Sequence, residues 1–106
     1  MIKRILILIT NLSALLLVVA QAPAIEWQKA LGGSSVDYAN SVQQTADGGY
    51  IVAGSSFSDD GDVAINHGYY DAWIVKLNST GGIQWQKSLG GSDYDEAYSI
   101  QQTSDG

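Results

Sequence analysis

The chain contains a single histidine, and the residues around it raise the question of nucleophilic chemistry. Asp71 lies four residues after His67, and serines lie nearby in the sequence. A serine nucleophile requires a base that is held rigidly between the hydroxyl group and an acid. His67 falls in a polar stretch from about residue 56 to residue 70, which favours a loop. The pattern therefore predicts no catalytic residue, and we expect a protein that is not an enzyme.

Carboxylates in the same stretch could bind a cation. Asp59, Asp60 and Asp62 lie in the segment SDDGDVAIN, and Ca²⁺ takes six to eight oxygen ligands. The segment lacks the EF-hand spacing, because no Glu stands where the twelfth ligand should be. Two interpretations stay open: a calcium site formed by these three residues, or a solvated acidic rim that keeps the protein soluble. No other cofactor is indicated, and no pair of carboxylates is singled out for glycoside cleavage.

Aromatic residues follow this stretch and offer a binding surface. Tyr69, Tyr70 and Trp73 could form a platform that stacks against a sugar, while packing in the core and at the rim is the simpler alternative. Tyr69, Tyr70 and Asp71 are the residues that we expect to form a ligand-binding rim.

An internal repeat sets the positions of many of these residues. Residues 25–48 read IEWQKALGGSSVDYANSVQQTADG and residues 83–106 read IQWQKSLGGSDYDEAYSIQQTSDG, with 16 of 24 positions identical at an offset of 58. A fixed period of this size indicates a repeat architecture in which neighbouring units cover each other's apolar faces. Trp27 and Trp85 are equivalent by this offset, so we expect them to pack between units. The glycine pairs that follow them are expected in turns or bulges, since no lysine and no helix complete a phosphate loop.

The alternation of apolar residues and turn residues predicts an all-β protein. Strands are expected at about 39–45, 49–55, 71–77 and 83–89. Additional strand segments are expected at 25–27 and 98–103. The second and third of the four strands are continuous apolar runs, which suits strands that are covered on both faces. Four antiparallel strands in each unit favour a β-propeller blade, with a β-solenoid and a β-sandwich as alternatives.

Strands that alternate in direction place their connections at two opposite ends of the sheet. The turns at 46–48 and 78–82 fall at one end. The 55–70 loop and the connections 32–38 and 90–96 fall at the other end. That second end collects eight of the eleven acidic residues, namely Asp37, Asp59, Asp60, Asp62, Asp71, Asp93, Asp95 and Glu96. Because a loop of this length is usually functional or disordered, we expect the binding surface at this end.

The first 24 residues have the layout of a secretory signal peptide. Lys3 and Arg4 precede an apolar core from Ile5 to Ala20, and small residues then allow cleavage after Ala20 or after Ala24. A membrane anchor is the alternative, but a spanning helix needs roughly 20 apolar residues. We therefore expect export through the Sec pathway and a secreted or cell-surface location.

The composition limits the partners of the exported part. Without Lys3 and Arg4 the chain keeps 3 basic and 11 acidic residues, which gives a net charge of about −8. Nucleic acid and an anionic membrane surface both require basic patches, so neither is expected as a partner. The absence of cysteine excludes disulfides and thiolate metal sites.

The string WQKxLGGSxxDxAxSxQQTxDGGYIVAGSS, followed by DAWIVKLNSTGGIQWQK, resembles a repeat of large secreted bacterial and archaeal proteins. The resemblance covers residues 25–106. It implies a β-propeller-type fold, and many proteins of this kind carry a C-terminal sorting domain for type IX secretion. It implies no established catalytic residues.

The sequence thus divides into a signal peptide at 1–24, a first β-repeat at 25–82 and a partial second repeat at 83–106. Since the second copy stops within a turn, we expect an N-terminal piece of a longer protein. The leading function is a noncatalytic binding or adhesion scaffold whose partner is an extracellular protein or a glycan. The alternatives are an accessory propeller of a larger secreted enzyme and a nonfunctional gene remnant. Exposed strand edges are expected to promote self-association.

Overall fold

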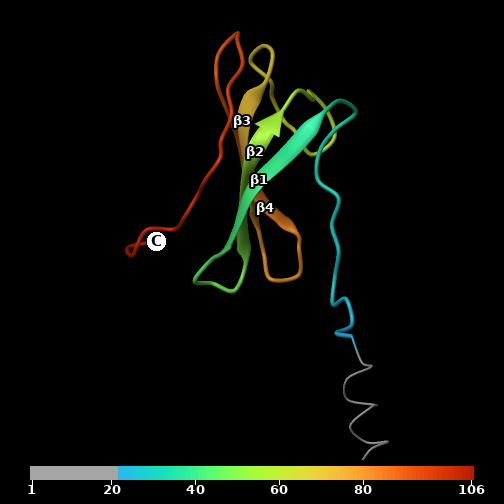
Figure 1. The fold of residues 1–106 in the computed structure, drawn as a ribbon, viewed down its shortest axis with the longest axis vertical. Coiled ribbons are helices and arrows are strands. Elements are labelled where there is room, and N and C mark those ends of the chain that lie inside the picture. The colour runs from blue at the N-terminus through green and yellow to red at the C-terminus, as the bar shows by residue number, and fades with distance from the viewer. Residues whose placement is uncertain (1–21) are drawn as a thin grey trace, which may run out of the picture.

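The computed structural model describes residues 22–106, and its centre is one antiparallel sheet (Figure 1). The sheet has the order β1-β2-β3-β4, with each strand antiparallel to its neighbour in the sequence. The strands are β1 (Asp37–Gln44), β2 (Tyr50–Ser56), β3 (Asp71–Leu77) and β4 (Ile83–Leu89). Residues 22–106 contain no helix. The predicted all-β class and the four predicted strands are therefore confirmed.

Short turns with local hydrogen bonds explain why the strands fold back on each other. At the β1–β2 turn the backbone N–H of Thr45 donates to the carbonyl of Gly49 at 2.9 Å, and Gly48 has φ of 83°. At the β3–β4 turn the side-chain oxygen of Asn78 accepts the backbone N–H groups of Thr80 and Gly82. Glycine supplies the positive φ that such turns require.

The two faces of the sheet are covered by the two ends of the described chain. Neighbouring residues of a strand point to opposite sides of the sheet. Face A carries Tyr50, Val52, Trp73, Val75 and Leu77. Face B carries Ile51, Ala53, Lys76 and Trp85. Residues 25–36, the N-terminal arm, lie over face A. Residues 94–106, the C-terminal arm, lie along face B. The central strands β2 and β3 are therefore buried on both faces, as their apolar runs predict.

The core lies on face A beneath the N-terminal arm. Val63, Trp73, Val75 and Leu77 form a buried cluster. Residues that are partly buried pack against it, namely Trp27, Leu31, Tyr50, Val52 and Ile83. The ring of Trp27 meets that of Tyr50 edge to face, with centroids 5.5 Å apart. The first tryptophan of the repeat therefore packs on the sheet within its own unit.

Two predicted strand segments are absent from the sheet. Residues 25–27 and 98–103 have no strand conformation, although their repeat equivalents, 83–85 and 40–45, lie in or next to β4 and β1. The difference has a physical reason: β4 pairs with β3 and β1 pairs with β2, whereas the two arms have no such partner strand beside them. An unpaired strand is unfavourable because its backbone groups lack ladder hydrogen bonds.

The predicted sorting of the connections onto two ends of the sheet is confirmed by contacts. At one end lie the two tight turns, while the 57–70 loop contacts the 32–36 and 90–95 connections at the other end. Figure 1 shows the two turns at the lower end of the sheet and the longer connections at the upper end. The predicted signal peptide falls almost entirely outside the described residues. Within residues 22–106, no helix has the length and hydropathy needed to cross a membrane.

Candidate functional site

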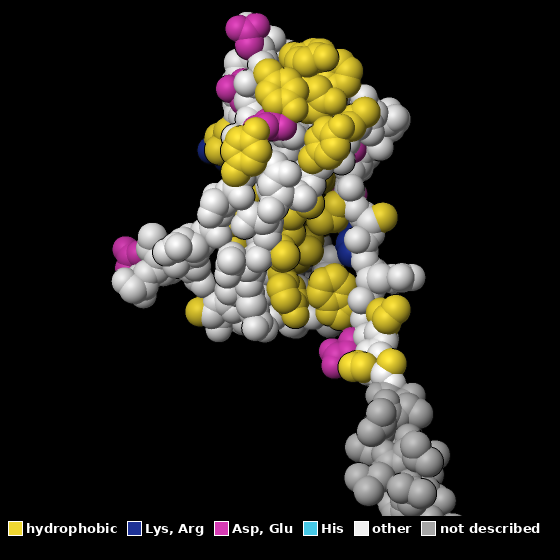
Figure 2. All heavy atoms as spheres, in the orientation of Figure 1, with side chains coloured by type: hydrophobic (Ala, Val, Ile, Leu, Met, Phe, Trp, Pro, Cys, Tyr) yellow, Lys and Arg dark blue, Asp and Glu magenta, His cyan; other side chains and the backbone are white. Residues whose placement is uncertain are grey.

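Five aromatic rings cluster at the end of the sheet that carries the 57–70 loop. Tyr70 lies at the centre of this cluster, and its ring centroid is 4.6–6.3 Å from those of the other four. The outer members are Tyr38, Phe57, Tyr69 and Tyr94. These four side chains are 39–52% exposed. We call the five residues the aromatic cluster, and Figure 2 shows hydrophobic side chains gathered at this end of the molecule.

An acidic side chain borders the aromatic cluster. The hydroxyl of Tyr94 donates to Oε1 of Glu96 at 2.6 Å, and the hydroxyl of Tyr98 donates to Oε2 of the same carboxylate. The hydrogen bond to Glu96, together with burial, raises the pKa of Tyr94 to about 12. Burial among neighbouring rings and acids also raises the pKa of Tyr70. Tyr70 and Tyr94 therefore stay neutral at physiological pH and keep their hydroxyl groups as donors.

The sequence prediction found part of this surface. Tyr69 and Tyr70 belong to the aromatic cluster, whereas Asp71 is fully buried and binds His67, so it does not lie on the predicted rim. Trp73 does not belong to the cluster, because it is 5% exposed and belongs to the core of face A. Tyr38 and Tyr94 were missed as members, since they are 56 residues apart in the sequence and only the folded sheet brings both to Tyr70. The predicted order of the strands places residues 38, 57, 70 and 94 at one end of the sheet. That order could have identified the other members of the cluster from the sequence.

Three of the eight acidic residues at this end, Asp37, Asp60 and Asp62, accept hydrogen bonds from a neighbouring loop. Four successive backbone N–H groups, those of residues 32–35, donate to side chains. The pairs are Gly32 with Asp62 at 3.1 Å, Gly33 with Asp37 at 2.9 Å, Ser34 with Asp60 at 2.7 Å, and Ser35 with the hydroxyl of Ser58 at 3.0 Å. We call residues 32–35 the first glycine-serine segment and residues 58–62 the acceptor loop. Together they fasten the N-terminal arm to the sheet.

The hydrogen bonds from Ser34 affect the titration of Asp60. The backbone N–H and the hydroxyl of Ser34 hold the pKa of Asp60 below its ordinary value. Asp37, the first residue of β1, accepts the largest number of these hydrogen bonds and is the hub of the interaction. Besides the backbone N–H of Gly33, it accepts the hydroxyl groups of Ser56 and Ser58. Hydrogen bonds that involve a charged partner are stronger than neutral ones. Asp37, Asp60 and Asp62 therefore form a clasp of hydrogen bonds that holds the first glycine-serine segment.

The three residues of the predicted calcium site point to different partners. Asp60 and Asp62 accept from the first glycine-serine segment, while Asp59 accepts the backbone N–H of Asn66 at 3.1 Å. Within residues 22–106, no group of three or more His, Cys, Asp or Glu side chains is arranged to hold a metal ion. Calcium binding by Asp59, Asp60 and Asp62 stays a prediction from sequence, and the geometry gives these carboxylates another role.

The histidine and the aspartate singled out by the sequence do meet. Nδ1 of His67 lies 2.6 Å from Oδ2 of Asp71. Ser88 lines a cleft of about 250 Å³ together with His67, but its hydroxyl makes no hydrogen bond. A nucleophilic triad requires a bond between serine and histidine, and the described part of the chain shows only the aspartate–histidine half of that arrangement.

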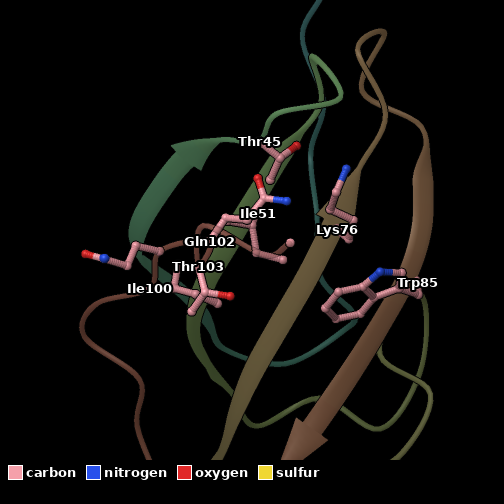
Figure 3. Close-up of a pocket in the computed structure, with 9 residues that line it drawn as sticks. Thr45, Ile51, Lys76, Trp85, Ile100, Gln102 and Thr103 are labelled. Atoms are coloured by element: carbon pink, nitrogen blue, oxygen red, sulfur yellow. The ribbon is translucent and has the colours of Figure 1, made fainter.

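The second tryptophan of the repeat differs from the first. Trp85 lies on face B and is 50% exposed, in contrast with Trp27, which packs on Tyr50. It borders a cleft of about 320 Å³ between face B and the C-terminal arm. Figure 3 shows Trp85, Ile51 and Lys76 on the sheet side of this cleft, with Ile100 and Thr103 on the arm. Packing between units stays a prediction for both tryptophans, because Trp27 contacts residues of its own unit and one side of Trp85 is open.

Comparison of the chain with protein-family models, with curated proteins and with solved structures finds no match.

Proposed function

We propose that this chain is a noncatalytic exported β-repeat protein that binds an extracellular protein or glycan through the aromatic cluster. The observation that carries the proposal is a group of four exposed rings packed around Tyr70 at one end of the sheet. Contiguous exposed apolar surface of this kind marks interaction sites. Tyrosines combine a flat apolar face with a polar hydroxyl, which suits a ligand that is partly solvated.

The shape of the cluster favours an extended ligand over a small molecule. Tyr38 lines a cleft of about 230 Å³ with Leu31 and Trp73, whereas Tyr69, Tyr70 and Tyr94 line none of four clefts of about 230–320 Å³ among residues 22–106. Small-molecule sites are usually concave, whereas stacking against a chain of sugars or a peptide segment needs only an exposed ring surface. Glu96 at the border can accept hydrogen bonds from hydroxyl or amide groups of such a ligand.

The sheet itself supports a propeller-type assembly as the scaffold. One four-stranded antiparallel sheet in simple sequence order is the unit from which a propeller blade is made. The repeat of 58 residues supplies the means to add further units. We propose that the described sheet is one such blade.

Export is the cellular part of the proposal, and it has its own test. The mature N-terminus is expected at Gln21 or Ile25, because small residues precede both positions. The intact mass of the chain recovered outside the cytoplasm would decide between them. Recovery of the uncleaved chain as an integral membrane protein would contradict export.

Binding is tested by changing rings of the aromatic cluster. Tyr69→Ala with Tyr94→Ala removes two exposed rings and is expected to weaken binding by at least about tenfold, the effect of 1.4 kcal/mol. Trp85→Ala is the matched control, since Trp85 is equally exposed but lies outside the cluster. Binding to immobilised polysaccharides and to extracellular proteins would be measured in parallel. An equal loss in both variants would exclude the aromatic cluster as the binding surface.

A further inference from the structure

The repeat supplies two glycine-serine segments but only one acceptor loop. Gly-Gly-Ser occurs at 32–34 and again at 90–92, while the sequence SDDGD occurs once, at 58–62. In the structure the backbone N–H groups of residues 32, 34 and 35 in the first segment donate hydrogen bonds to side chains of the acceptor loop. Residues 22–106 therefore hold two glycine-serine segments, the second at 90–93, for one acceptor loop.

The second glycine-serine segment is preformed and exposed. The backbone N–H of Gly91 donates to Oδ2 of Asp95 at 2.9 Å, the same distance at which Gly33 donates to Asp37. Residues 90–94 are all exposed. Of the four N–H groups in the segment, only that of Gly91 donates to a described residue. The local turn of the first segment is thus repeated in the second. The backbone of Gly91 and Ser92 packs closely against Gly68, but the second segment donates no hydrogen bond to an acceptor loop among the described residues.

The substitutions between the two segments leave the donors intact. Ser35 is replaced by Asp93, but the contact in the first segment uses the backbone N–H of Ser35 and not its side chain. Gly32 has φ of 139°, whereas Gly90 does not share a positive φ. Docking in the same manner would require rotation at Gly90, which glycine allows without a side-chain clash.

The apolar residues beside the two segments also correspond. Trp27, five residues before Gly32, packs against Tyr50 on face A. Trp85, five residues before Gly90, lies on face B with half of its side chain exposed. If face B of one sheet is placed on face A of another, Trp85 reaches the position that Trp27 occupies.

We propose that the second glycine-serine segment of one chain docks onto the acceptor loop of a second copy, in place of that copy's own first segment. The contact is head-to-tail, because it joins different surfaces of the two copies. Heterologous contacts of this type generate an open series of oligomers unless the rotation closes a ring. This inference concerns assembly and does not depend on the ligand proposed above.

Two segments must move for this contact to form. The N-terminal arm of the receiving copy must leave the acceptor loop, and the C-terminal arm of the donating copy must leave face B. Neither arm contributes a strand to the sheet. Because the first segment is part of the same chain, it competes with an effective concentration of about the millimolar range. The unaltered chain is therefore not expected to associate through this contact at micromolar concentrations.

A matched pair of glycine substitutions tests the proposal. A Cβ atom at Gly33 would lie 2.5 Å from the backbone oxygen of Asp60 and 2.6 Å from Cβ of Ser58, so Gly33→Ala expels the first segment from the acceptor loop. A Cβ atom at Gly91 would meet nothing within 4 Å, so Gly91→Ala leaves the monomer intact. In a docked complex, however, the alanine at 91 would meet Asp60 and Ser58 of the second copy.

Sedimentation velocity over a concentration series gives the readout for the full chain. Gly33→Ala is expected to associate at concentrations at least about tenfold lower than the unaltered chain, and the double variant Gly33→Ala/Gly91→Ala is expected to return to monomer. Association of the double variant to the same extent as Gly33→Ala would overturn the proposal, since exposed core would then explain it. A Gly33→Ala chain that stays monomeric would overturn it as well.

A peptide experiment keeps the proposal testable if Gly33→Ala does not fold. A labelled peptide of residues 83–96 is titrated with the unaltered chain and followed by fluorescence anisotropy. Binding is expected in the millimolar range, and the same peptide with Gly91→Ala is expected not to bind. Equal binding of both peptides, or binding of neither, would contradict docking at the acceptor loop.

Discussion

Nδ1 of His67 lies 2.6 Å from Oδ2 of Asp71, and the same carboxylate oxygen accepts the backbone N–H of His67 at 2.9 Å. The Asp71 side chain is fully buried, while that of His67 is 44% exposed. The pair joins the end of the 57–70 loop to the first residue of β3. It therefore positions Tyr69 and Tyr70, which lie between the two residues, within the aromatic cluster.

This arrangement predicts unequal effects of the two alanine substitutions. Asp71→Ala removes the acceptor of both bonds from a buried site, so the free energy of unfolding should fall by about 1–3 kcal/mol. His67→Ala should have a smaller effect, because its backbone N–H still reaches Asp71 and water replaces its exposed ring. Urea denaturation measures both changes. A larger loss for His67→Ala would show that the histidine and not the aspartate holds the loop.

Equivalent aspartates in the two repeat copies should differ in their importance for stability. Asp37 accepts hydrogen bonds from Gly33, Ser56 and Ser58, whereas Asp95 accepts one from Gly91 at an exposed site. Asp37→Ala is expected to lower the free energy of unfolding by about 2–3 kcal/mol, since hydrogen bonds to a charged group are each worth about 1.5–3 kcal/mol but are not additive. Asp95→Ala should change it by less than about 1 kcal/mol. Similar effects of both substitutions would contradict the role of Asp37 as the hub of the clasp.

Acid should destabilise the β1–β2 turn. Hydrogen bonds from the hydroxyl of Thr45, the backbone of Gly49 and the ammonium group of Lys76 hold the pKa of Asp47 well below its ordinary value of 3.8. A lowered pKa in the folded state means that this stabilisation is present above the unfolded pKa, near 3.8, and is lost as the pH falls through the folded pKa. Thermal unfolding from pH 6 to pH 2 should therefore depend less steeply on pH in Asp47→Asn than in the unaltered chain. If the melting temperatures of Asp47→Asn and of the unaltered chain depended equally on pH, Asp47 would be excluded as a source of the acid sensitivity.

Alkali should act on the aromatic cluster. The carboxylate of Glu96 raises the pKa of Tyr94 from 10.0 to about 12. For a raised pKa the stabilisation is fully present below the unfolded value and is lost as the pH rises through the folded value. Stability should thus fall between about pH 10 and pH 12, and Tyr94→Phe should remove part of this dependence. Spectrophotometric titration of tyrosinate absorbance would follow the group directly, and a simple transition near pH 10 for every tyrosine would contradict the contact with Glu96.

Local signals predicted the sheet well. The strands β1 to β4 lie within two residues of the predicted boundaries, since each is delimited by turn residues such as Gly48 and Gly81 whose conformations are decided locally. The arrangement of connections at two ends followed from the alternation of strand direction alone. These features depend on short stretches of sequence, so a single sequence contains the information.

Features that depend on distant partners were not predictable in the same way. The segment WQK forms part of β4 at 85–87 but no strand at 27–29, because only the second copy lies beside β3. The composition of the acceptor loop indicated cation ligands, yet its carboxylates bind backbone N–H groups that lie 26 and 30 residues away in the sequence. The same residue types satisfy both roles, and only the fold distinguishes them.

The sheet crosses the boundary between the two sequence copies, with three strands from one copy and the fourth from the next. This has a consequence for the gene that encodes it. Unequal recombination between two copies of the repeat adds or removes a multiple of 58 codons, wherever in the unit the crossover occurs. Every product keeps a strand equivalent to β4 after each strand equivalent to β3, so we expect relatives of this gene to vary in length in steps of one unit without the loss of any sheet.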